Sequence, residues 1–249
     1  MSIESFLGTY RVTTTYGTQF GLDTEVVIGS SEAGLEVQIR PPGRTSPESL
    51  PATYDAEAET LQLALAEPAA QMFIARVREV DYRAIYGVVV FEPTDDRPVR
   101  RLAVWGANLL VAEFAEPNPT VTNPARQELF RGIYRIKATA GAQFGVGSTL
   151  EVGEVLPDGT QSLSIVNALG QELADTPQLS YDAATGSLGG PTTPQGSPVK
   201  IRMSLAAIPD TTGATINVVY GLSLVGDPEQ AATWAGDDDG AGLGTGGAG

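Results

Sequence analysis

The chain of 249 residues contains no cysteine, no histidine and only two lysines, Lys137 and Lys200. Without cysteine it forms no disulfide, which leaves the redox compartment open. Without imidazole or thiolate groups it lacks the usual general base, the usual thiol nucleophile and the ligands of ordinary zinc, haem and iron–sulfur sites. We therefore expect no cofactor and no metal. Carboxylates, tyrosines and arginines remain for any acid–base chemistry.

Familiar catalytic motifs are also missing. The sequence holds no Gly-x-Ser-x-Gly elbow, no Gly-x-x-x-x-Gly-Lys loop and no Gly-x-Gly-x-x-Gly segment opening a helix. Triad hydrolysis, P-loop phosphoryl transfer and Rossmann hydride transfer are thus unsupported, and the sequence leans away from an enzyme. No apolar run approaches the ~20 residues that span a bilayer, and the first residues do not resemble a secretory signal. We expect a cytoplasmic protein with no membrane partner, with export by a signal-independent route as the alternative.

Basic residues are scarce overall. The chain has 15 lysines and arginines against 30 acidic residues, a formal charge of −15. The excess is spread along the chain, with 9 basic and 15 acidic residues in 1–106 and 5 and 9 in 129–236. Such a surface repels phosphate backbones, so nucleic acid is not an expected partner.

The feature that organises the chain is an internal duplication. Gly8–Arg11 and Gln19–Gly21 return as Gly132–Arg135 and Gln143–Gly145 at a constant offset of 124 residues. Looser matches continue the repeat: Tyr54-Asp55-Ala56 with Tyr181-Asp182-Ala183, Tyr86-Gly87 with Tyr220-Gly221, and Trp105 with Trp234. A unit of about 105 residues is an ordinary domain size. The duplication predicts two similar domains.

Each unit has the periodicity of β-strands. Leu35–Ile39 and Ser162–Ile165 alternate apolar and polar residues at period two. Ile85–Phe91 and Ile216–Leu222 are β-branched and aromatic runs, typical of strands packed on both faces. We predict six to eight short strands per unit, with a short helical turn near 103–114 as the only candidate helix.

These patterns predict an all-β protein of two tandem antiparallel β-barrels. The first barrel covers 6–106, a proline-rich linker covers 107–128 around Pro117–Pro124, and the second barrel covers 129–236. The acidic, glycine-rich end, 237–249, cannot bury apolar area and is expected to be disordered. A loop at Arg40–Pro47 interrupts repeat 1, and its counterpart in repeat 2 is Asn167–Pro177.

Two short motifs resemble the calycins, and the avidin branch in particular. Gly8-Thr9-Tyr10 resembles the avidin-like Gly-Thr-Trp opening, and Ala231–Gly236 resembles the Thr-Thr-Trp-Ser-Gly stretch that carries a biotin-contacting tryptophan. The resemblance implies barrels of about eight strands in which the opening aromatic packs across a closed end. Tyrosine replaces the opening tryptophan, and Arg11 and Arg135 replace the polar residue expected next. Biotin binding is therefore not implied.

The repeated Gln-Phe-Gly segment has two interpretations. In the first, Phe20 and Phe144 anchor a turn onto the core, and Gly21 and Gly145 permit a positive φ or a close backbone approach. In the second, the segment is a ligand-contacting loop at a barrel mouth. The first interpretation is favoured.

Arginine is the main asymmetry between the repeats, because six of the nine in repeat 1 fall between residues 76 and 101. Arg76 and Arg78 share one face of a strand. If Phe73, Ala75 and Val77 point inward, the arginines face solvent, and Arg76 aligns with Arg202. This interpretation is favoured. In the alternative, Met72 and Ile74 point inward and the arginines line a polar calyx.

If either repeat binds a ligand, we expect it to be repeat 1. Trp105 and Tyr86 would form apolar walls, and Arg76 or Arg101 would anchor the acid group of a planar ligand. Three functions stay open. The first is a non-catalytic protein that holds a small molecule or sugar in a barrel calyx or rim. The second is a structural or interaction protein, including a homo-oligomer, in which the duplication mimics a dimer, and the third is a cofactor-free cyclase or isomerase.

Overall fold

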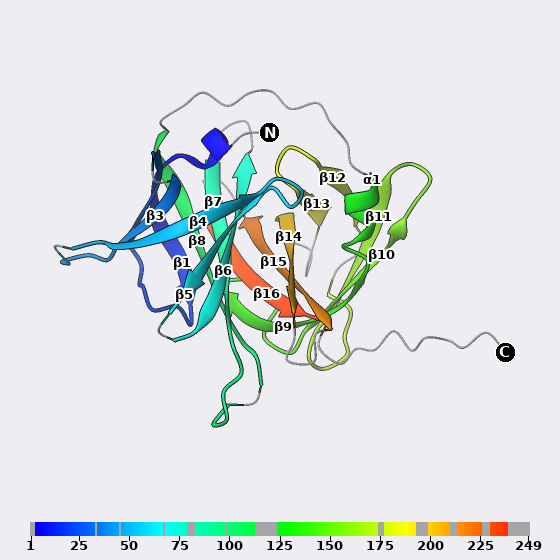
Figure 1. Ribbon diagram of the computed structural model, residues 1–249. Helices are drawn as coiled ribbons and strands as arrows, with labels where there is room; N and C mark the ends of the chain where they lie inside the picture. The colour runs from blue at the N-terminus through cyan, green and yellow to red at the C-terminus, as the bar shows by residue number, and fades with distance from the viewer. Residues whose placement is uncertain are drawn as a thin grey trace.

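The computed structural model describes residues 3–32, 34–44, 46–66, 68–78, 83–97, 99–112, 124–173, 177–192, 199–209, 214–225 and 230–238. It consists of two closed, eight-stranded antiparallel barrels, each built from one half of the chain (Figure 1). The predicted all-β fold and the tandem arrangement are confirmed.

Barrel 1 follows a short 3-10 helix, η1 (Ile3–Phe6), and its strands pair in chain order until β8 closes onto β1. The strands are β1 Gly8–Tyr16, β2 Glu25–Ser31, β3 Gly34–Arg40, β4 Glu48–Asp55, β5 Thr60–Leu65, β6 Ala70–Arg78, β7 Arg83–Phe91 and β8 Arg101–Ala112.

Barrel 2 follows helix α1 (Pro124–Glu128), and β16 closes onto β9 in the same way. Its strands are β9 Gly132–Ala140, β10 Thr149–Val155, β11 Thr160–Val166, β12 Gln178–Asp182, β13 Ser187–Thr192, β14 Val199–Pro209, β15 Thr215–Val225 and β16 Gln230–Asp237.

The end of barrel 1 differs from the predicted boundary. Residues 103–114 were expected to include a helical turn and 107–128 to form a linker, but β8 continues to Ala112 and pairs with β7 and β1. The residues after 106 are needed to close the barrel, because Gly8 pairs with Ala112. The predicted disordered tail, 237–249, begins too early, because Asp237 ends β16 and Asp238 accepts a hydrogen bond from the backbone N–H of Asn217. The prolines of the predicted linker before Pro124, and the rest of the tail from residue 239, lie outside the described residues.

The opening tyrosine of each repeat is buried, as predicted, near the barrel end where its first strand begins, which we call the plugged end. Tyr10 and Tyr134 are 4% and 0% exposed. The Tyr10 hydroxyl donates to the carbonyl oxygen of Phe6 at 2.8 Å, and the Tyr134 hydroxyl donates to that of Phe130 at 2.9 Å. Each tyrosine thus ties the first strand to the segment that precedes it, and the buried hydroxyl is satisfied.

The repeated tryptophans lie inside the barrels against glycines of the neighbouring strand. Trp105 pairs with Gly87 and Trp234 with Gly221. A Cβ atom added to Gly87 would come within 2.6 Å of the Trp105 indole, and one added to Gly221 within 2.4 Å of the Trp234 indole. This close approach explains why a glycine follows the tyrosine in both repeats.

The Gln-Phe-Gly segment anchors a turn, but its glycine does not have the predicted role. Phe20 packs edge-on against Trp105 at 5.6 Å between ring centroids, and Phe144 packs likewise against Trp234 at 5.4 Å. A Cβ atom on Gly21 would meet nothing within 4 Å, and Gly21 is not among the residues with positive φ. The left-handed position is Gly17, at φ 74°, four residues earlier.

The two barrels share an apolar interface formed by equivalent strands. The contacting pairs are β1 with β9, β6 with β14, β7 with β15, β8 with β16, β8 with β9 and β1 with β16. Tyr86 and Tyr220, which are equivalent in the repeats, meet at 5.6 Å, and the Tyr86 hydroxyl lies 2.8 Å from that of Ser204. Because both barrels use the same surface, the interface has the form of a twofold dimer contact.

This interface corrects the orientation predicted for β6. Phe73, Ala75 and Val77 face the second barrel, while Met72 and Ile74 face the interior of barrel 1. Arg76 is only 3% exposed and is not solvent-facing. The apolar Phe73–Val77 face looked like a barrel interior because the outer face of this strand is buried as well.

The predicted match of Arg76 with Arg202 is also wrong. Gly87 pairs with Ile74, and its equivalent Gly221 pairs with Met203, so the offset at β6 and β14 is 129 residues rather than 126. Arg76 therefore corresponds to Leu205, and its buried cation has no counterpart in repeat 2.

Candidate functional site

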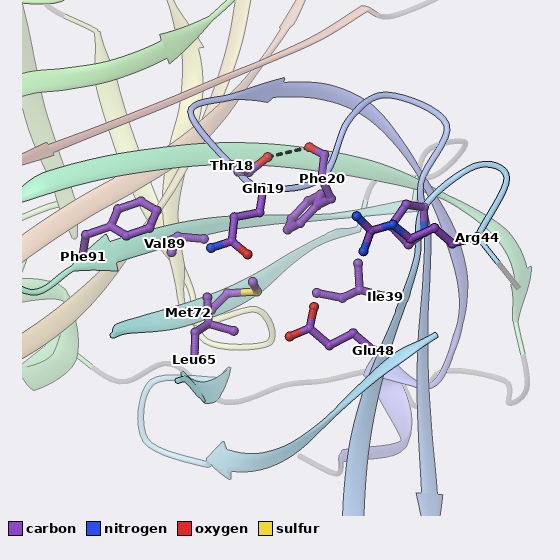
Figure 2. Close-up of a pocket in the computed structure, with 11 residues that line it drawn as sticks. Thr18, Gln19, Phe20, Ile39, Arg44, Glu48, Leu65, Met72, Val89 and Phe91 are labelled. Atoms are coloured by element: carbon purple, nitrogen blue, oxygen red, sulfur yellow. Dashed lines mark hydrogen bonds between the residues drawn. The ribbon is translucent and has the colours of Figure 1, made fainter. Parts of the chain in front are cut away.

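A cavity of about 420 Å³ opens at one end of barrel 1 (Figure 2). It lies at the end where β1, β3, β5 and β7 finish and β4 and β6 begin, and apolar side chains form most of its wall. The lining residues are Thr18, Gln19, Phe20, Ile39, Pro41, Arg44, Glu48, Leu65, Met72, Val89 and Phe91.

The β1–β2 loop forms one side of the cavity, and its own hydrogen bonds hold it in place. Gly17 takes a left-handed conformation that lets the chain leave β1. The Thr18 hydroxyl donates to the carbonyl oxygen of Phe20 at 2.7 Å (Figure 2) and accepts from the Thr15 hydroxyl at 2.6 Å. Phe20 is fixed by its contact with Trp105, so this wall is preformed.

The depth of the cavity is apolar because β6 and β7 each turn one face to the barrel interior. Ile39, Met72 and Val89 are buried members of the barrel 1 core. Figure 2 shows their side chains on the inner side of the cavity, with Leu65 next to Met72. These groups offer dispersion contacts and no hydrogen bonds, so an apolar part of a ligand would lie here.

Polar groups gather at the opening. The amide of Gln19 lies above Met72 and the guanidinium of Arg44 lies above Ile39, while the carboxylate of Glu48 lies below Ile39 (Figure 2). Arg44 and Glu48 are exposed, and neither forms an ion pair with a described residue. The cavity thus combines an apolar interior with donors and acceptors at its rim, as ligand pockets commonly do.

Trp105 and Tyr86, the predicted walls, do not face one pocket. Trp105 is fully buried inside barrel 1 and does not line the cavity, but it packs against Phe20, which does. Tyr86 lies on the outer side of the same barrel wall, in the interface with barrel 2. Residues 86 and 105 are on paired strands but on opposite faces of the sheet, which the sequence pattern did not resolve.

The two predicted anchors are also apart. Arg76 extends toward the plugged end of barrel 1, where its guanidinium lies 5.6 Å from the Phe6 ring centroid and Nη2 donates to the carbonyl oxygen of Ala184 in barrel 2. Arg101 is exposed and lies 4.0 Å above the ring of Phe91, a cavity-lining residue. Neither arginine lines the cavity itself.

Some cavity residues that the sequence analysis did not propose as site residues have a weak sequence signature of a ligand site. Gln19 and Phe20 belong to the repeated motif for which a ligand-contacting loop was the less favoured interpretation. Arg44 lies in the loop that interrupts repeat 1. Met72 and Val89 show no signal, because a cavity-lining apolar residue and a core residue have the same pattern.

A second polar cluster lies at the plugged end of barrel 1. The Tyr54 hydroxyl donates to Glu59 Oε2 at 2.7 Å, and Glu59 is 6% exposed with a positive φ of 53°. Burial raises the pKa of Glu59, opposed by the hydrogen bond from Tyr54 and by Arg76. Burial together with Glu59 raises the pKa of Tyr54. Neither side chain lines the cavity at the other end of the barrel.

Within the part of the chain that the structure describes, no group of three or more acidic side chains could hold a metal ion. None of the described helices is long and apolar enough to cross a bilayer.

Comparison with known proteins gives no family. No family model matches the chain, and no curated protein matches it. Among solved structures, a candidate outer membrane protein from Bacteroides fragilis aligns at 10% identity over 94% of this chain and 99% of its own, with a TM-score of 0.23. The tesB protein of Mycobacterium avium subsp. paratuberculosis aligns at 10% identity over 90% and 94%, with a TM-score of 0.17. Neither alignment supports an inference about this chain.

Proposed function

We propose that the chain is a non-catalytic binding protein that holds a small amphipathic molecule in the mouth of barrel 1. The cavity of about 420 Å³ is the observation that carries this proposal. Its volume lies within the range of roughly 300–1,000 Å³ that is usual for small-molecule sites. Its apolar depth and polar rim select a ligand with an apolar body and a hydrogen-bonding or charged head group.

The proposal is that of a calycin-like barrel, in which one end is plugged and the other is open. The hydrogen bond from Tyr10 to Phe6 and the burial of both aromatic rings support the plugged end. The head group of the ligand would meet Gln19, Arg44 and Glu48. Because these three side chains include both donors and acceptors, a zwitterionic or amide-like head group fits better than a simple anion.

A cofactor-free isomerase has less support. Such an enzyme needs a group of perturbed pKa inside the substrate cavity. Glu59, a carboxyl group with a raised pKa, lies at the plugged end, away from the cavity. An assembly function would use an exposed apolar face, whereas the apolar face that the two barrels share is already buried between them.

Tryptophan fluorescence tests the proposal. In a Trp234→Phe background Trp105 is the single tryptophan, and it contacts Phe20 in the cavity wall. Titration with dodecylphosphocholine monomers, which have an apolar chain and a zwitterionic head, is expected to shift Trp105 emission in a saturable way. Val89→Phe fills the cavity and is expected to abolish the shift.

The duplication supplies a matched control. Gln19→Ala is expected to weaken binding about tenfold, as loss of a hydrogen bond does, whereas Gln143→Ala changes the same motif in repeat 2 and should have no effect. Saturable binding that survives Val89→Phe, or that Gln143→Ala removes, would place the site elsewhere.

A further inference from the structure

A second recess lies between the two barrels and has a different chemistry. Its volume is about 510 Å³, and it is bordered by the start of β8, the β7–β8 hairpin and residues of β9 and the β9–β10 loop. The hairpin projects from barrel 1 beside β9 (Figure 1). We call this recess the basic groove, because four cations line it: Arg97, Arg100, Arg101 and Lys137.

The charge of the basic groove contrasts with that of the whole chain. Four of the 15 basic residues line it and none of the described acidic residues does, although the chain has twice as many acidic as basic residues. Asp95 and Asp96 occupy the tip of the same hairpin, where Thr94 and Arg97 exchange backbone hydrogen bonds, and they do not line the groove.

The arginines are not neutralised within the described structure. Lys137 pairs with the buried Asp237 at 2.8 Å, which compensates its charge. Arg97, Arg100 and Arg101 form no ion pair with a described residue. Arg101 is held over the ring of Phe91 at 4.0 Å, which positions its guanidinium without using its hydrogen-bond donors.

Apolar side chains complete the groove. Val99 and Val146 are 68% and 54% exposed, and they approach it from barrel 1 and barrel 2 respectively. Leu102 adds a third apolar wall. Large exposed aliphatic side chains beside unpaired arginines suit a ligand that has both an apolar surface and a negative charge.

We propose that the basic groove binds a small organic anion with an apolar body, such as an aromatic carboxylate. Its carboxylate accepts hydrogen bonds from the guanidinium groups of Arg97 and Arg101, and its ring lies against Val99 and Val146. Polyanions are excluded, because the net charge of −15 repels them over their whole length. A small ligand with a single carboxylate group interacts mainly with the positive charges of the groove. The groove shares no lining residue with the barrel cavity, although Arg101 is held over Phe91, which lines that cavity.

Calorimetric titration of the full chain with 2-naphthoate tests this. Binding is expected at about 20 mM salt and is expected to weaken severalfold at about 500 mM salt, because the anchoring arginines are partly exposed. The neutral analogue 2-naphthylmethanol is expected to bind at least ~10-fold more weakly, since it cannot form charge-assisted hydrogen bonds.

Variants separate this groove from other sites. The double variant Arg97→Gln/Arg101→Gln is expected to weaken 2-naphthoate binding ~10-fold or more and to remove most of its salt dependence. The control Arg11→Gln/Arg131→Gln removes the same charge from exposed positions outside the groove and should leave affinity unchanged. Val89→Phe, which fills the barrel cavity, should also leave it unchanged.

Three results would overturn the proposal. They are an unchanged affinity in Arg97→Gln/Arg101→Gln, a loss of binding in Val89→Phe, and tighter binding of a hexaglutamate peptide than of 2-naphthoate. The second would assign the anion to the barrel cavity, and the third would assign the groove to an acidic protein partner.

Discussion

The indole nitrogen of Trp234 donates a hydrogen bond to the hydroxyl of Ser223 at 3.1 Å. Trp105 holds the equivalent position in repeat 1, but its Nε1 is buried with no hydrogen-bond partner among the described residues. The register of β7 and β15 places Val89 where repeat 2 has Ser223. Repeat 1 has therefore exchanged a hydrogen bond for an apolar side chain that lines its cavity.

This exchange predicts that serine is tolerated at position 89 better than alanine. Both Val89→Ser and Val89→Ala lose buried apolar area, but only serine can accept the proton of Trp105 Nε1. We expect Val89→Ser to be more stable than Val89→Ala by ~1 kcal/mol, the usual net value of a hydrogen bond. Urea unfolding of the two variants measures this difference. Equal stabilities would show that Nε1 does not reach the residue at 89.

The glycines beneath the tryptophans give a second prediction. Gly87→Ala and Gly221→Ala place a methyl group within 2.6 Å and 2.4 Å of an indole ring. Since the rings are enclosed by the core, each change is expected to destabilise the protein by ~3 kcal/mol. Gly29→Ala is the control, because it also lies in a strand but its new methyl group would meet nothing within 4 Å. A similar loss in the control would contradict this explanation of the repeated glycine.

The sequence predicted the fold better than it predicted the site, for a physical reason. The repeat and the period-two pattern are local, so they predicted strands and two barrels. The orientation of β6 depends on what covers its outer face, and Phe73 and Val77 contact the second barrel. Ile85–Phe91 was correctly read as packed on both sides, since every residue of β7 after Arg83 is buried. Applying the same reading to β6 would have placed Arg76 inside.

The candidate site stays a prediction. The cavity lies in repeat 1, where a ligand was expected, whereas the basic groove takes residues from both repeats. Trp105 and Tyr86 could not be assigned to opposite faces without the pairing of β7 with β8. The turn at Gly17 was missed because the positive φ was assigned to Gly21, the glycine of the repeated motif.

The plugging tyrosine gives a third prediction. Tyr10→Ala removes a buried ring and is expected to destabilise the protein by ~3 kcal/mol or more. Tyr10→Phe keeps the ring and loses only the hydrogen bond to Phe6, so a loss of ~1 kcal/mol is expected. Urea midpoints of the two variants separate packing from hydrogen bonding. An unchanged midpoint for Tyr10→Ala would mean that the ring does not plug the barrel.

The raised pKa of Glu59 predicts that the stability of the protein depends on pH. Burial raises its pKa above the ordinary value of 4.5, so the folded state binds a proton more tightly than the unfolded chain does. The unfolding free energy should therefore fall as the pH rises from about 4.5 through the pKa of the folded state. Glu59→Gln keeps an acceptor for Tyr54 and does not titrate.

Comparison of Glu59→Gln with the parent protein separates the contribution of Glu59 to the pH dependence of stability from that of other carboxyl groups. Glu59→Gln should be more stable relative to the parent at pH 7 than at pH 4, in chemical unfolding at each pH. The opposite trend would mean that Arg76 and the Tyr54 hydrogen bond outweigh the effect of burial on this carboxyl group.

The twofold form of the interface predicts how the two halves behave when they are separated. Residues 1–123 and 124–249, expressed apart, would each expose the apolar face that carries Tyr86 in one and Tyr220 in the other. Co-expressed, they are expected to form a one-to-one complex that size-exclusion chromatography with light scattering detects.

The packing of two turns explains why the complex should contain one copy of each half rather than two copies of one. The turn at Gly186 lies against Ala58, and a Cβ atom at Gly186 would come within 2.2 Å of the Ala58 carbonyl oxygen. In a dimer of the first half, Glu59 would occupy the place of Gly186 and its side chain would collide there. Gly186→Ala should therefore weaken the complex of the two halves, while Gly159→Ala, at a positive-φ glycine with open space around it, should not. Homodimers of the first half that were as stable as the mixed complex would show that this contact does not set the choice of partner.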